Sequence, residues 1–174
     1  MEVCADICYH GVRKGERMKL LFKQRLFSWF DSYDIFDEWG ETVYTVEGKL
    51  AWGKCLHILD RSGQHIATLR GRVFSFLPCF ELYIGETCVG TVQKAFTFLK
   101  PRFEVDFNGW QVHGDFWEWE YTVREGCGGL VATVSKDVWR LTDTYVIDVI
   151  RPEDALHALM LVLAIDAEKD SRNN

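Results

Sequence analysis

Proline and long apolar segments are both scarce in this chain of 174 residues. There are only 3 prolines, which excludes collagen-like repeats and a proline-rich linker architecture. The longest apolar run covers residues 158–165, well short of the ~20 residues that a helix needs to cross a bilayer. Because 48% of the residues are hydrophobic and 14% are aromatic, disorder is excluded as well. We therefore expect one folded domain without a transmembrane segment.

Positive charge is also in deficit. The chain has 20 Lys and Arg residues against 26 Asp and Glu residues, a formal net charge of −6. A protein that binds nucleic acid needs a basic surface that displaces counterions from the phosphates. We therefore expect no nucleic-acid partner.

The 6 cysteines lack the Cys-x-x-Cys spacing and the spaced histidines of a structural zinc site. We predict buried or half-buried free thiols, and no metal or cofactor. Residues 1–17 contain no apolar run of the kind found in a secretory signal. Free cysteines without an export signal are typical of a reducing cytoplasm, so the expected location is cytoplasmic, either in solution or peripheral at a membrane.

Glycine-centred turns recur along the chain at intervals of about 20 to 24 residues. They lie at Gly40, Gly63, Gly85, Gly109 and residues 126–129. Short segments with period-two alternation precede the turns, and a threonine with a branched aliphatic residue follows four of them. Each unit then continues into a basic residue and a further apolar stretch, such as residues 73–76. The pattern predicts about a dozen short strands in a sandwich or barrel.

One segment near the C-terminal end departs from this pattern. Pro152 suits the first position of a helix, and the apolar residues within 155–167 cover every direction of the helical wheel. A helix that is apolar all round must be surrounded by the rest of the protein. We therefore predict an all-β barrel with one central helix, whose core-filling side chains are Leu156, Leu159, Met160 and Leu163.

The order of the motifs resembles the LURP-one-related family of the Tubby C-terminal-like superfamily, to which the phospholipid scramblases also belong. The resemblance runs from about residue 18 to residue 167. Its carriers are residues 18–28 (MKLLFKQRLFS), 60–63 (DRSG), 74–78 (FSFLP), 96–101 (FTFLKP) with Phe103, 114–116 (GDF), 142–145 (TDTY) and 165–167 (IDA). The resemblance implies a twelve-stranded β-barrel closed around a hydrophobic C-terminal helix, in agreement with the residue patterns.

The resemblance also sets the expected domain organisation. Residues 1–17 precede the match, and we expect a disordered arm or an extension from an upstream start. Residues 18–168 are expected to form a single barrel domain, and residues 169–174 a polar tail.

No known catalytic motif is present: the Gly-x-Gly-x-x-Gly, P-loop, His-Glu-x-x-His and Gly-x-Ser-x-Gly patterns are all missing. The 5 histidines are isolated in sequence, and His157 in the apolar helix is expected to be a satisfied core or rim residue. The densest acidic cluster is Asp31, Asp34, Asp37 and Glu38. Alternation along a strand would turn these carboxylates apart, so we predict a solvated strand edge rather than a calcium site.

Basic residues supply the candidate binding site. Lys94, Lys136 and Arg72 each follow a threonine-aliphatic pair at equivalent places in the repeat. Arg70 is close to Arg72 in the sequence. If these positions line one rim, Arg70, Arg72, Lys94 and Lys136 could bind an anionic headgroup or phosphate. The alternative interpretation is that they protect strand edges and pack over aromatic rings.

Three classes of function follow. The leading expectation is a non-catalytic binding or scaffold domain whose partner is an anionic phospholipid or phosphoinositide headgroup, because the resemblance implies headgroup binding in Tubby domains. The second is a small-ligand-binding protein or enzyme with a site at the barrel mouth, although a lumen filled by the helix leaves little volume for a ligand. The third is a protein-interaction domain that uses exposed tryptophans such as Trp39, Trp52 or Trp110. The oligomeric state is left open.

Overall fold

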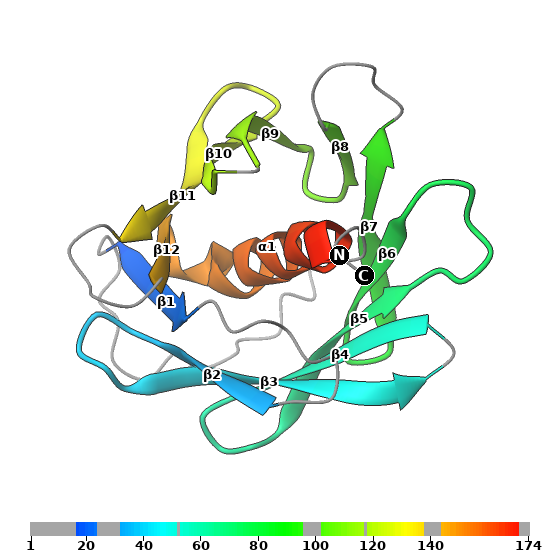
Figure 1. Ribbon diagram of the computed structural model, residues 1–174. Coiled ribbons are helices and arrows are strands. Elements are labelled where there is room, and N and C mark those ends of the chain that lie inside the picture. Colours follow the sequence, from blue (N-terminus) through cyan, green and yellow to red (C-terminus); the bar gives the residue numbers. More distant parts are fainter. Residues whose placement is uncertain are drawn as a thin grey trace, which may run out of the picture.

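The computed structural model describes residues 17–23, 32–51, 53–95, 102–116, 118–137 and 144–170. Antiparallel strands surround one helix (Figure 1). The strands are β1 (Met18–Lys23), β2 (Ser32–Phe36), β3 (Thr42–Ala51), β4 (Gly53–Leu59), β5 (His65–Gly71), β6 (Cys79–Ile84), β7 (Thr87–Ala95), β8 (Arg102–Asp106), β9 (Trp110–Asp115), β10 (Glu120–Glu125), β11 (Leu130–Asp137) and β12 (Thr144–Val149). A 3-10 turn, η1 (Pro152–Asp154), leads into α1 (Ala155–Asp170).

The predicted glycine turns connect neighbouring strands. In the β4–β5 turn, Asp60 Oδ1 accepts hydrogen bonds from the backbone N–H groups of Ser62 and Gln64 at 2.8 and 2.9 Å. Gly63 follows with φ +80°, a left-handed conformation that favours glycine. Asp37 caps the β2–β3 turn in the same way, with Gly40 at φ +88°. An aspartate followed three residues later by glycine is therefore the local signal for this turn.

The strands form one sheet in the order β8-β7-β6-β5-β4-β3-β2-β1-β12-β11-β10-β9. β1 pairs with β12, with Met18 opposite Val149 and Lys23 opposite Thr144, so the beginning and end of the barrel meet in one ladder. β8 and β9 occupy the two ends of the sheet order and are not paired with each other. The barrel is consequently closed everywhere except at this β8–β9 seam, which lies above α1 in Figure 1.

α1 runs through the middle of the barrel (Figure 1). The four predicted core side chains, Leu156, Leu159, Met160 and Leu163, are each no more than 3% exposed. Inward residues of the strands, among them Leu20, Ile58 and Leu82 at 0% exposure, belong to the same core cluster. The predicted fold, a twelve-stranded barrel around a hydrophobic C-terminal helix, is confirmed.

Two local predictions differ from the structure. The apolar stretch at residues 73–76, expected to be a strand, lies in the loop between β5 and β6. The helix, expected to end at Ala167, continues to Asp170 and includes the start of the predicted polar tail. Glu168, within this last turn of the helix, has a buried ion-pair partner, described below.

Candidate functional site

The predicted basic residues lie toward one end of the barrel, because they are at or near the ends of β5, β7 and β11, which run in the same direction. α1 ends there too: Lys94 Nζ lies 2.6 Å from Glu168 Oε1, and Lys54 Nζ donates to Ala167 O at 2.7 Å. We call this end the α1-terminal rim; the C-terminal end of α1, coloured red, marks it in Figure 1.

Lys94 and Lys136 belong to the inner face of the sheet. Lys94 is opposite the buried Phe103, and Lys136 is opposite the buried Tyr145. Directly opposed residues share a face of a sheet. The Lys94 side chain is only 11% exposed and is ion-paired with Glu168. Its charge is therefore compensated inside the protein and does not contribute to a basic surface. Lys136 is exposed, but β11 is far from β5 in the sheet order.

Arg70 and Arg72 lie together on the outer face. Arg70 is opposite Glu81, and its guanidinium carbon is 5.4 Å from the centre of the Tyr83 ring. Arg72 Nε lies 2.6 Å from Glu81 Oε1, and this hydrogen bond lowers the pKa of Glu81. Both arginines are exposed. The structure therefore brings together Arg70 and Arg72, with one excess positive charge beside Glu81, and does not gather all four predicted residues.

Exposed apolar side chains occupy two loop tips beside these arginines. Phe74 is 99% exposed and Phe76 is 96% exposed in the β5–β6 loop, and Leu50 is 86% exposed at the tip of the β3–β4 hairpin. The two tips touch, since a Cβ placed on Gly53 would lie 2.9 Å from Val73 Cγ2. We call Leu50, Val73, Phe74 and Phe76 the loop-tip surface.

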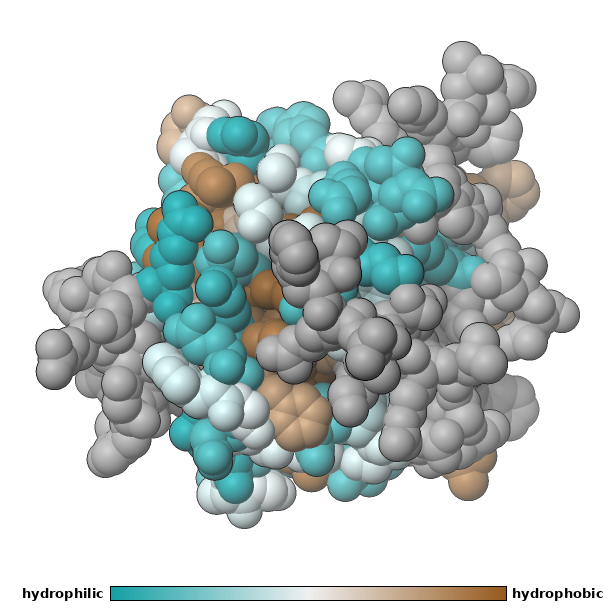
Figure 2. All heavy atoms as spheres, turned by 60° about the vertical axis from the view of Figure 1, so that its left-hand side comes forward, coloured by the Kyte–Doolittle hydropathy of each residue, from teal (hydrophilic) through white to brown (hydrophobic). Residues whose placement is uncertain are grey.

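Burying a phenylalanine typically contributes about 1.5–3 kcal/mol, so side chains this exposed add almost nothing to the core. Figure 2, which turns the opposite end of the barrel forward, shows a described surface that is mainly hydrophilic with a short hydrophobic strip at its centre. The loop-tip surface is therefore a concentration of apolar groups at the α1-terminal rim that folding alone does not explain.

The sequence pattern predicted that Phe74 and Phe76 belong to an apolar strand. An apolar run with alternation gives the same local signal whether it packs inward or projects outward, so nothing in the sequence identified this surface. The proline at position 78 is the one local feature that argues against a paired strand here.

Cations also complement the C-terminal end of α1, where the helix dipole is negative. Besides Lys54 and Lys94, Lys169 Nζ donates to Phe116 O at 2.8 Å and lies 4.2 Å from the centre of the Trp119 ring. Burial lowers the pKa of Lys169. These contacts join the end of the helix to β4, β7 and the β9–β10 turn, and their partners are too far apart in sequence to be predicted from it.

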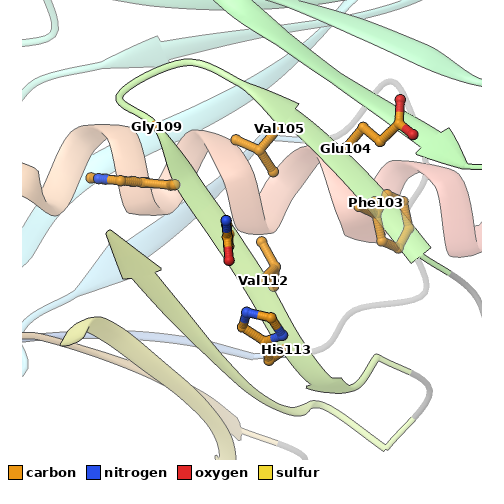
Figure 3. A pocket seen from close by; sticks show the side chains of 8 residues that line it. Phe103, Glu104, Val105, Gly109, Val112 and His113 are labelled. Atoms are coloured by element: carbon orange, nitrogen blue, oxygen red, sulfur yellow. The ribbon is translucent and has the colours of Figure 1, made fainter. Parts of the chain in front are cut away.

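A groove of about 470 Å³ follows the β8–β9 seam (Figure 3). Phe103, Glu104 and Val105 line it from β8, and Val112 and His113 from β9. Figure 3 shows the Glu104 carboxylate directed away from the His113 ring. The groove therefore brings no acid-base pair together, although it contains both residue types.

His157 lies behind the β8–β9 turn. Its ring centre is 6.1 Å from that of Phe107 and 6.2 Å from that of Trp110. Burial lowers the pKa of His157, while Asp154 acts in the opposite direction. The expected core or rim histidine is thus half-buried against aromatic rings.

The lowered pKa of His157 predicts a loss of stability in mild acid. Below about pH 6.5 the unfolded chain binds the proton more readily than the folded one, so stability is lost as the pH falls through the lowered value. We expect the melting temperature of H157Q to fall less than that of the wild type between about pH 7 and pH 5. H113Q, at an exposed position of β9, is the control; equal slopes for wild type and H157Q would contradict the assignment.

The acidic cluster has a structural role. Asp37 is 6% exposed and accepts hydrogen bonds from the N–H groups of Trp39 and Glu41, and from Arg61 at 3.0 Å. The expectation of a solvated strand edge is wrong for Asp37, because its carboxylate caps a turn. Asp34 accepts a hydrogen bond from Thr45, and Asp31 lies outside the described residues. In the part of the chain that the structure describes, no three His, Cys, Asp or Glu side chains could hold a metal ion.

The tryptophans named for a protein interface do not form one surface. Trp39 is 76% exposed, but it precedes β3 and so lies at the end of the barrel opposite the loop tips. Trp110 is 4% exposed, which contradicts its expected exposure: its ring packs against Phe107 in the core. Trp52 lies outside the described residues.

Four of the cysteines fall within the described residues, and none of these four is in a disulfide. Cys55 and Cys79 are buried, as predicted, and burial raises the pKa of both thiols. Cys88 and Cys127 are exposed instead, in or beside turns. Within the described residues, no helix is both long and apolar enough to span a membrane.

The described strands form a barrel around a C-terminal helix, and comparisons with known proteins identify the family to which the chain belongs. The family model for LURP-one-related proteins matches residues 18–166. The chain therefore belongs to the LURP-one-related family. It is 30% identical over 150 residues to the uncharacterized protein YxjI of Bacillus subtilis (strain 168), covering 86% of this chain and 92% of YxjI. An X-ray structure of a protein from Arabidopsis thaliana has the same fold, with a TM-score of 0.60 and 18% identity over 88% of this chain and 92% of the other.

Proposed function

We propose that this protein is a non-catalytic domain that docks on anionic phospholipid surfaces through the loop-tip surface. The observation that carries the proposal is the near-complete exposure of Phe74 and Phe76 in one loop, 99% and 96%, two and four residues beyond Arg72. Aromatic side chains can enter the interface between headgroups and acyl chains. The arginines would remain at the level of the phosphates.

The distribution of charge also supports docking with the loop-tip surface toward the membrane. The protein as a whole is negative, with a formal net charge of −6, so a general attraction to anionic lipid is not expected. Arg70 and Arg72 provide a local exception next to the loop tips, and each basic residue near such a surface contributes about 1 kcal/mol. Docking would therefore combine apolar insertion with a small number of phosphate contacts.

Vesicle co-sedimentation tests the proposal. The wild type should bind vesicles of phosphatidylcholine with phosphatidylserine and not vesicles of phosphatidylcholine alone. The double variant F74A/F76A should bind at least tenfold more weakly, because it loses the apolar insertion. R70E/R72E should bind at least tenfold more weakly as well, because the local charge changes sign.

The chain offers a matched control in W39A, which removes an exposed aromatic side chain at the opposite end of the barrel. W39A should bind as the wild type does, and W39A and F74A/F76A should keep the wild-type melting temperature. Absence of wild-type binding, or equal losses for W39A and F74A/F76A, would refute the proposal. Vesicles of equal charge that contain a phosphoinositide distinguish a specific headgroup from general anionic lipid.

A further inference from the structure

The turn between β8 and β9 has the geometry of a hairpin turn, but the two strands are not paired with each other. Asn108 and Gly109 have φ angles of 52° and 62°, as a two-residue type I′ turn requires, and Trp110 N–H donates to Phe107 O at 3.2 Å. Such a turn normally joins two paired strands. Here β8 pairs only with β7 and β9 only with β10 among the described strands, so each presents an edge toward the groove.

Unpaired sheet edges carry backbone N–H and C=O groups that can accept another strand. Natural proteins usually protect such edges by covering them or by placing charged side chains, above all lysine, or proline there. Neither Lys nor Pro occurs within β8 or β9, and the exposed Glu104 and Asp106 of β8 are acidic, so they oppose an acidic strand but not a basic one. The groove of about 470 Å³ lies directly between these two edges, within the volume range of typical binding sites.

The side chains beside the groove define the chemistry of an added strand. Phe103 and Val105 of β8 face inward, whereas Glu104 and Asp106 are exposed on the outer face. Asp115 lies on the outer face at the end of β9. Among the described side chains of β7 to β10, the outward cation is Arg124, which donates to Gly128 O. Among the described side chains, the outer rim of the groove is therefore acidic and its inner side is apolar.

We propose that the β8–β9 seam binds an extended peptide segment in which basic and apolar residues alternate, as an additional strand of the sheet. Side chains directly opposite each other on paired strands lie about 4.5–5.5 Å apart. The basic residues of the peptide would lie beside Glu104 and Asp106, and its apolar residues beside Val105 and Val112. Backbone hydrogen bonds supply affinity, and the alternating faces supply specificity.

This site is independent of the loop-tip surface, which lies on the β3–β4 and β5–β6 connections. A second copy of the chain is a less favourable occupant, because pairing two identical seam edges would bring the acidic residues of both copies together.

The test uses a fluorescent peptide of about eight residues in which lysine and valine alternate, at about 150 mM salt to screen general attraction. Fluorescence anisotropy should show saturable binding to the full chain. Two further peptides carry backbone N-methyl groups on the lysines or on the valines, which removes one row of donors each; at least one of them should lose binding. Hydrogen exchange of amides in β8 and β9 should slow on binding, whereas exchange in β4 should not change.

Charge reversal locates the site. The double variant E104K/D106K should bind the lysine peptide about tenfold more weakly and should gain affinity for a glutamate–valine peptide. E86K/E153K, which changes the same charge at exposed positions outside the seam, should behave as the wild type. Absent binding, undiminished binding of both N-methylated peptides, or equal losses in the two double variants would overturn the proposal. A wild-type dimer that the peptide dissociates would also overturn it, because a second copy would then occupy the edge.

Discussion

Replacing Leu159 with alanine is expected to lower the free energy of unfolding by about 3 kcal/mol, within the range for deleting a buried leucine side chain. Leu159 is 0% exposed in the middle of α1 and belongs to the core cluster formed by the helix and the barrel wall. A closed sheet cannot collapse easily around a missing side chain, so most of the cavity should persist. Urea denaturation measures the change, as a lower midpoint with an unchanged slope.

The control for L159A is F74A, which removes a larger apolar side chain from a position that is 99% exposed. F74A should change the free energy of unfolding by less than about 0.5 kcal/mol. A loss below about 1 kcal/mol for L159A would mean that α1 is not tightly packed in the barrel.

Replacing Glu168 with alanine is expected to destabilise the protein by about 3–5 kcal/mol, because it leaves the ammonium group of Lys94 buried without its partner. The two side chains are 3% and 11% exposed and lie 2.6 Å apart. Burial raises the pKa of Glu168, and Lys54 counteracts this shift. The main effect of the pair on stability is therefore the cost of leaving one buried charge unpaired when the other residue is replaced.

A double variant separates this cost from the value of the pair. In K94M/E168L both charges are replaced by apolar groups, and stability should return to within about 1 kcal/mol of the wild type. K49A breaks the more exposed Lys49–Glu47 pair, 43% and 31% exposed, and should cost less than about 1 kcal/mol. Equal losses for E168A and K94M/E168L would show that lost packing, not an unpaired charge, dominates.

The strands, turns and helix were predictable because each has a local signal. Asp60 and Gly63 mark a turn within four residues, and residues 155–167 are apolar on every side of a helix. The resemblance to LURP-one-related proteins predicted the number of strands and their closure around the helix. These features depend on short windows of sequence or on the order of motifs, so the structure could be anticipated at that level.

The candidate site was predicted less well, because it depends on which face each residue occupies. Lys94 follows the same local pattern as Arg72, yet β7 turns it inward to Glu168, 74 residues away, whereas Arg72 remains exposed beside Glu81. Phe74 has the apolar neighbours of a core residue, yet it projects from a loop. The turn at Asn108 and Gly109 looks like the other hairpin turns, and only the closure of the whole sheet makes it the seam.

The pairing of β1 with β12 has a consequence for biosynthesis. Apart from the pairing of Leu21 with Phe36 of β2, the ladder of β1 forms with β12, and α1, which fills the barrel, follows β12. A nascent chain that has left the ribosome up to β11 has a curved sheet without an interior, so its inward apolar residues have no helix to cover them. Contacts this distant in sequence form slowly, and exposed apolar surface favours aggregation. We therefore expect the native core to form only after α1 has been synthesised, because the helix completes the barrel interior.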